Sequence, residues 1–202
     1  MPRYAAFRLW FILSLPAVLI AFKAGMSSDP QIFRALAHPA AEFSARLMIL
    51  AMMATPLMLL FKGHEAPRWL CKNRRALGVS AFLYAAIHVL FYLIDRASWA
   101  VVTADLSKTY ILAGWLGFAI LLPLAATSCD YCVRRMGPRW KKLQRWAHPA
   151  ALLVLLHWAA IYDWAHPFEA FLHFTPLLFL QGHRIWYWYL RPRPVRRQSE
   201  GF

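Results

Sequence analysis

The sequence predicts an all-α integral membrane protein, a bundle of six transmembrane helices with both termini in the cytoplasm. Of the 202 residues, 60% are hydrophobic and 16% aromatic, whereas soluble domains are about 45–50% apolar even when glycine is counted. Long apolar runs alternate with basic connections. The net charge of +14 does not indicate a nucleic-acid partner, because the basic residues lie between apolar runs and not on a water-exposed amphipathic surface.

Six apolar runs reach, or nearly reach, the ~17–25 residues that cross a hydrocarbon core. The first should remain as a helix, since no small-residue cleavage site follows it. The fifth is short. The sixth is the weakest, because Glu169 and His173 interrupt it and it needs the aromatic residues 185–189 as an interfacial extension. The expected spans are Ala5–Phe22, Ser44–Phe61, Leu77–Ile94, Tyr110–Ala126, His148–Tyr162 and Phe168–Leu180.

The distribution of Lys and Arg predicts the orientation of these spans. Seven basic residues lie at the N-terminus and after the second span, six after the fourth and five after the sixth, which makes eighteen of 23 on one side. Cytoplasmic loops carry the excess of basic residues. Both termini are therefore expected in the cytoplasm, and the third and fifth helices should run outward in parallel.

One membrane domain, residues 1–190, followed by a basic cytoplasmic tail, residues 191–202, is the expected organisation. The tail is rich in Arg and Pro, a composition typical of a disordered end. A multi-pass membrane protein, with the lipid bilayer as its solvent, corresponds to this organisation.

The three cysteines fall on the predicted cytoplasmic side, where thiols remain reduced, so no structural disulfide is expected. Cys129-Asp-Tyr-Cys132 forms a Cys-x-x-Cys pair, but a zinc site would need two more ligands and a thioredoxin-like motif would need a βαβ unit. Two free thiols are the preferred interpretation.

Two histidines inside predicted spans are the main candidates for function, since ligand-capable side chains in a membrane are costly. His88 lies 13 residues after Arg75 and His157 lies 12 after Arg145, so both are about 20 Å from the cytoplasmic ends of their helices. Two histidines at one depth on parallel helices can ligate a haem from opposite faces. The absence of Cys-x-x-Cys-His argues against covalent, c-type attachment.

A structural interpretation of the same histidines stays open, because an intramembrane His often only hydrogen-bonds to a neighbouring helix. The spacing alone does not decide between the two. No nucleophile and base, phosphate loop or paired carboxylate occurs in the spans, so we expect no independent active site and only electron transfer as an activity.

The run from Arg74-Arg-Ala-Leu-Gly to Ala-Ile-His88, followed by Tyr92, resembles the third-helix signature of the MsrQ (YedZ) family, haem-binding membrane subunits within the ferric-reductase-like transmembrane superfamily. Thr55-Pro56 ends the second helix as in that family, and His157 falls on its fifth-helix histidine. Further similar segments are Tyr110 with Gly114, Leu124-Ala-Ala-Thr-Ser128 and Arg134-Arg-Met-Gly-Pro-Arg-Trp-Lys-Lys-Leu143.

One position departs from the family pattern. Members usually carry a histidine after Trp-x-x-Leu, and Gln144 stands there in this chain. His148, one turn further, shares the face of position 144 but is half a turn out of phase with His157 and precedes Pro149, which disfavours helical geometry. We therefore expect one haem, with His88 and His157 as axial ligands of its iron.

The resemblance implies a multi-pass protein of the bacterial inner membrane with a function in electron transport. A b-type haem subunit would relay electrons from quinol or a cytoplasmic flavin reductase to a periplasmic molybdoenzyme that repairs methionine sulfoxide, with FMN or a quinone as a further cofactor. Gly114 could admit the macrocycle, although close helix packing explains it equally well. The alternatives are an accessory or structural subunit of a larger membrane complex, with or without haem, and a stand-alone transmembrane ferric or quinone reductase.

Overall fold

The computed structural model describes residues 3–161, 164 and 167–190, and every regular element within these ranges is helical. The all-α prediction is confirmed. The elements are α1 (Arg3–Met26), α2 (Ile32–Leu60), α3 (Glu65–Arg96), α4 (Trp99–Asp105), α5 (Thr109–Ala126), α6 (Asp130–Met136), α7 (Pro138–Gln144), α8 (Ala147–Ala159), α9 (Pro167–Ile185) and the π-helical turn η1 (Trp186–Leu190).

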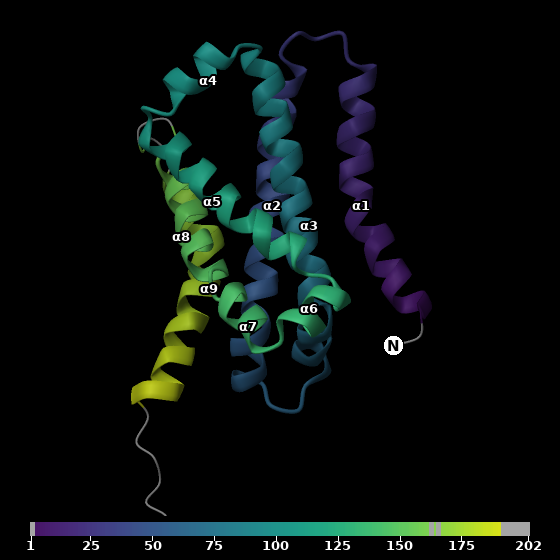
Figure 1. Ribbon diagram of the computed structural model, residues 1–202, viewed down its shortest axis with the longest axis vertical. Coiled ribbons are helices and arrows are strands. Elements are labelled where there is room, and N and C mark those ends of the chain that lie inside the picture. The colour runs from purple at the N-terminus through teal and green to yellow at the C-terminus, as the bar shows by residue number, and fades with distance from the viewer. Residues whose placement is uncertain (1–2, 162–163, 165–166, 191–202) are drawn as a thin grey trace, which may run out of the picture.

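Of the six longest helices, α1, α2, α3, α8 and α9 run up and down the long axis of the bundle, and α5 crosses it obliquely (Figure 1). Short α4 covers one end. Short α6 and α7 lie at the opposite end, together with the α2–α3 turn and the N-terminus (Figure 1). The basic segments thus gather at a single end of the bundle, which we call the basic end; the other is the α4 end.

Four of these helices are long and apolar enough to cross a membrane: α1 from Phe7, α2, α3 and α5. The remaining two are less clear-cut. α8 has 13 residues, about 20 Å at 1.5 Å per residue, and α9 carries Glu169 and His173 in its first half. The structure therefore supports four spans directly, and the count of six stays a prediction.

Two helices begin much earlier than expected. α2 starts at Ile32, not Ser44, and α3 at Glu65, not Leu77. Charged residues interrupt the apolar pattern in the added turns, Arg34 and Glu42 in α2 and Glu65, Arg68 and Lys72 in α3, and most of their residues are good helix formers such as Ala, Leu, Glu, Lys and Arg. A search for apolar runs misses such turns because they continue the helix without continuing the apolar pattern.

Small residues allow α2 and α3 to pack closely along their length, as in many membrane helix pairs. Ala40 and Ala54 of α2 are fully buried, and Ala81 of α3 is almost so. Ser44 adds an interhelical hydrogen bond, its hydroxyl donating to the Ala81 carbonyl at 2.8 Å. This pair forms the rigid centre on which the other helices lie.

A tyrosine attaches α1 to this centre through a break in the α1 hydrogen-bond ladder. Pro16 lies inside α1, and prolines disrupt the ladder around them. The Tyr84 hydroxyl accepts from the Ala17 amide at 2.9 Å and donates to the Leu13 carbonyl at 2.7 Å. These two groups would pair with each other in a regular helix, so Tyr84 replaces a missing helical bond.

The expectation of two free thiols at Cys129 and Cys132 is wrong, since the structure joins them in a disulfide. Cys129 is the N-cap of α6 and Cys132 lies one turn further, which places the Cα atoms 5.2 Å apart, within the range of disulfides. The expectation of free thiols was based on the predicted cytoplasmic location of the cysteines and did not consider this local geometry. Cys71 is free. The predicted tail, residues 191–202, lies outside the described residues.

Candidate functional site

His88 of α3 and His157 of α8 meet inside the bundle, nearer its α4 end. Their ring centroids are 6.1 Å apart and their planes are inclined by 71°. Both rings line a cavity of about 90 Å³. The other lining residues are mainly apolar or aromatic: Ala41, Ser44, Ala85, Val89, Tyr92, Ile111, Gly114, Trp115, Phe118, Leu121 and Val154.

The orientation of His157 depends on α5. Its Nδ1 lies 2.6 Å from the Tyr110 carbonyl oxygen, and because a carbonyl only accepts, Nδ1 must carry the proton. The ring occupies the space next to Gly114, where a Cβ would stand 2.7 Å from Nδ1 and 2.9 Å from Cε1. Gly114 is thus needed for the imidazole to lie where it does. Gly117, by contrast, has only ordinary contacts with α8, starting at 3.6 Å.

His88 is held in the same way by α2. Its Nδ1 lies 2.9 Å from the Ala37 carbonyl oxygen and must also be the protonated nitrogen. The Nε2 atoms of His88 and His157 therefore both keep a free lone pair. A backbone carbonyl on Nδ1 is the usual way in which proteins fix an imidazole as a metal ligand through Nε2.

A charged cluster, formed by Tyr92, Arg96, Asp105 and Lys108, bounds this cavity toward α4. Asp105 is 5% exposed and accepts hydrogen bonds from Tyr92 at 3.0 Å and Lys108 at 2.8 Å, with the Arg96 guanidinium at 2.9 Å. The Lys108 hydrogen bond is the main cause that lowers the pKa of Asp105, against the opposing effect of burial. The cluster fixes α4 to α3 beside Tyr92, a lining residue. Sequence reasoning missed it, although Asp105 lies between Arg96 and Lys108.

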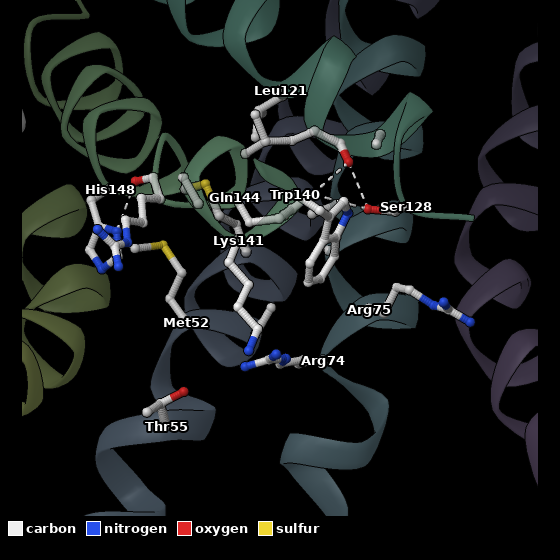
Figure 2. A pocket seen from close by; sticks show the side chains of 18 of the residues that line it. Met52, Thr55, Arg74, Arg75, Leu121, Ser128, Trp140, Lys141, Gln144 and His148 are labelled. Atoms are coloured by element: carbon white, nitrogen blue, oxygen red, sulfur yellow. Dashed lines mark hydrogen bonds between the residues drawn. The ribbon is translucent and has the colours of Figure 1, made fainter. Parts of the chain in front are cut away.

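Gln144 and His148 lie elsewhere, in a larger cavity of about 460 Å³ at the basic end (Figure 2). The Gln144 amide nitrogen donates to the Leu124 carbonyl at 3.0 Å and lies 3.4 Å from the Ser128 hydroxyl. The His148 Nδ1 lies 3.0 Å from the Arg145 carbonyl. Leu121 lines both cavities. The structure thus brings His88, His157 and Gly114 together and places Gln144 and His148 in the neighbouring cavity.

His173 has both ring nitrogens occupied. Nδ1 lies 2.8 Å from the Glu169 carbonyl, and Nε2 lies 3.3 Å from the Arg46 guanidinium, which can only donate. Arg46 also pairs with Glu42 at 2.8 Å, and the His173 ring packs on Trp158 at 4.9 Å between centroids. This arrangement leaves no lone pair for a metal.

Comparison with known proteins identifies the family of this chain. Residues 40–155, more than half of the chain, match the family model described as "Ferric reductase like transmembrane component". The chain belongs to the ferric reductase-like transmembrane family. The match contains His88 and runs from residue 40 of α2 through most of α8, and it ends two residues before His157.

Relatives of this ferric reductase-like chain carry the name "Protein-methionine-sulfoxide reductase heme-binding subunit MsrQ". The protein from Rhodospirillum rubrum is 38% identical over 121 residues, 58% of this chain and 56% of that protein. The one from Xanthomonas campestris pv. campestris is 32% identical over 154 residues, 74% and 67% of the two chains. The one from Yersinia pseudotuberculosis is 27% identical over 157 residues, 74% of each. The chain therefore spans between about half and three quarters of these relatives. No solved structure matches it.

Proposed function

We propose that this ferric reductase-like chain is a b-type haem membrane subunit that relays electrons across the bilayer, with His88 and His157 as the axial ligands of one haem. The observation that carries the proposal is the pair of imidazoles 6.1 Å apart, each with Nδ1 on a backbone carbonyl and Nε2 free. When bound, the haem supplies a one-electron redox centre.

The separation of the rings fits two ligands of one metal ion. A metal–imidazole bond of about 2 Å and a ring centroid about 1 Å behind Nε2 require centroids roughly 6 Å apart, close to the 6.1 Å observed. The 90 Å³ cavity is smaller than a macrocycle, so we expect the surrounding side chains to move apart when haem enters.

The chain's own residues would orient the ligands and keep the site dry. The Ala37 and Tyr110 carbonyls hold the two imidazoles in the tautomer that offers Nε2. Gly114 leaves the His157 ring its place. Trp115, Phe118 and Leu121 give an apolar surround, which limits solvent access and so helps set the redox potential.

We extend the proposal to topology and partners. Six spans with cytoplasmic termini in a bacterial inner membrane are supported by the gathering of basic segments at one end (Figure 1). The name of the relatives supports a protein-methionine-sulfoxide reductase as the partner. We propose that this partner is a periplasmic molybdoenzyme. Quinol or a cytoplasmic flavin reductase would be the donor, with FMN or a quinone as a further cofactor. The chain acts as an electron-transfer subunit and has no independent active site.

A visible spectrum of the purified protein tests the haem assignment. The reduced-minus-oxidised difference should show a b-type band that His88→Ala and His157→Ala each abolish. His173→Ala is the matched control, because both nitrogens of that ring are engaged elsewhere, and it should keep the band. A band that survives either of the first two substitutions would contradict the ligand assignment, and a wild-type protein without any band would favour a haem-free structural subunit.

A further inference from the structure

The larger cavity at the basic end carries an unusual excess of positive charge. Among its lining residues are five cations: Arg74, Arg75, Lys141, Arg145 and Arg184. No Asp or Glu lines it in the described part of the chain. Arg75 forms an ion pair with Asp130, and within the described residues the other four have no ion pair. The field of four uncompensated charges around one opening favours an anion.

The cations that line the cavity come from different elements. Arg74 comes from α3, Lys141 from α7 and Arg184 from α9. Figure 2 shows the ends of Lys141 and Arg74 pointing to the same side of the cavity, below Gln144 and Trp140, whereas Arg75 points away. Like charges repel unless a counter-charge lies between them, so this arrangement suits a single anionic group.

The interior of the cavity is apolar and pliable. Met48 and Met52 of α2 and Leu121 and Leu124 of α5 line it, and methionines adapt to flexible apolar ligands. The polar donors near them are already engaged. The Gln144 amide nitrogen bonds within the protein, the Gln181 amide nitrogen lies 3.4 Å from the Met52 carbonyl, and the Trp140 indole donates to the Thr127 carbonyl at 3.1 Å.

We propose that this cavity binds one anionic phospholipid of the cytoplasmic leaflet, its phosphate on the Arg74, Lys141 and Arg184 side chains and its apolar part against Met48, Met52 and Leu121. Basic pockets between membrane helices on the cytoplasmic side recognise anionic head groups in this way. The volume of about 460 Å³ is that of a small-ligand pocket. The proposal rests on the proposed orientation of the bundle but not on the haem ligands.

Other phosphate-bearing molecules share part of this chemistry. A flavin mononucleotide or inorganic phosphate would also neutralise the cations. A flavin ring, however, is read by hydrogen-bond donors and aromatic faces, and here the amide and indole donors are engaged. Inorganic phosphate would leave the apolar walls without a partner. A phospholipid can neutralise the cations with its phosphate and cover the apolar walls with its acyl chains.

The full-length protein, purified in mild detergent, provides the test by native mass spectrometry against a mixture of phosphatidylglycerol and phosphatidylcholine. One phosphatidylglycerol per chain should be retained, and excess inorganic phosphate should not displace it. Arg74→Gln with Lys141→Gln should weaken retention about tenfold or more for each lost charge-assisted bond. Lys142→Gln is the matched control, since Lys142 is the next residue of α7, is exposed as Lys141 is, and does not line the cavity.

Four results would overturn the proposal: equal retention of both lipids, equal loss in Lys141→Gln and Lys142→Gln, displacement by phosphate, or a stoichiometric flavin released by acid in place of lipid. The single exposed substitution Lys141→Gln decides the matter if the double variant does not fold. The haem band, recorded on the same samples, is independent. A protein that keeps phosphatidylglycerol but shows no haem contradicts the proposed function alone.

Discussion

The cavity between His88 and His157 and the cavity at the basic end share Leu121, yet their polar groups are partnered in opposite ways. In the first, the imidazoles bond to backbone carbonyls and Tyr92 bonds to Asp105. In the second, four of five cations have no ion pair within the described residues. Directed bonds preorganise a site for a ligand of fixed geometry, whereas unpaired charge in a roomy cavity suits a pliable anion.

Gly114→Ala should have the largest effect and should affect only the histidine cavity. The new Cβ would stand 2.7 Å from Nδ1 of His157, closer than atoms can approach, so the ring must move and lose its Tyr110 bond. We expect haem content to fall at least tenfold and the free energy of unfolding to fall by about 1–3 kcal/mol. Haem per chain and thermal unfolding in detergent measure both.

Gly117→Ala is the internal control for this change. It lies one turn along α5, and its Cβ would meet α8 atoms at 3.6 Å or more, an ordinary contact, so haem content should stay at the wild-type level. Equal haem in both alanine variants would show that the ring position seen here does not matter for binding.

Tyr84→Phe should destabilise the bundle without affecting either cavity directly. The phenylalanine would leave the Ala17 amide and the Leu13 carbonyl unpaired, away from water, where each unsatisfied group costs about 1–3 kcal/mol. Thermal unfolding should show the loss, while each folded molecule keeps its haem and its lipid. Tyr131→Phe, the same change at a 63% exposed position, should be neutral.

Acid should weaken the charged cluster at the α4 end. The pKa of Asp105 is lowered, mainly by the Lys108 hydrogen bond and also by Tyr92 and Arg96. A carboxyl with a lowered pKa stabilises the fold above its ordinary value near 4, and this contribution disappears as pH falls through the lower, folded value. Unfolding temperature should therefore drop by about 2–4 °C more in wild type than in Asp105→Asn between pH 5 and 3. If the unfolding temperatures of wild type and Asp105→Asn fell in parallel over this pH range, the stabilising role of the Asp105 carboxylate would be contradicted.

The fold was largely predictable from the sequence because lipid imposes a simple pattern. Apolar runs located α1, α2, α3 and α5, and the all-α class followed. The helix starts at Ile32 and Glu65 were missed, since turns interrupted by charged residues continue a helix beyond an apolar window. The disulfide was missed because a cap geometry, not a compartment, brings Cys129 to Cys132.

The site was predictable only in part. Equal depth on parallel helices predicted that His88 lies near His157. Gly114 was also predicted to leave space at this site, and the space beside it is occupied by the His157 ring. The partners that orient the rings, Ala37 and Tyr110, act through backbone carbonyls, which any residue possesses, so no residue type could reveal them. The larger cavity is lined by six helices, α2, α3, α5, α7, α8 and α9, which meet only in three dimensions, and its cations looked like topology signals.

Gln144→Ala should have the smallest effect, although it changes the position where the family usually has a histidine. Its amide bonds at 3.0 and 3.4 Å to Leu124 and Ser128 are partly exposed and neutral, so their loss should cost about 1 kcal/mol or less. Neither the charge of the larger cavity nor the contacts of His157 would change. Haem content, the b-type band and phosphatidylglycerol retention should match wild type in the assays above. Gly114→Ala changes the histidine cavity and Gln144→Ala changes the larger one. If Gln144→Ala also removed the haem band, the two cavities would have to act as a single cofactor site.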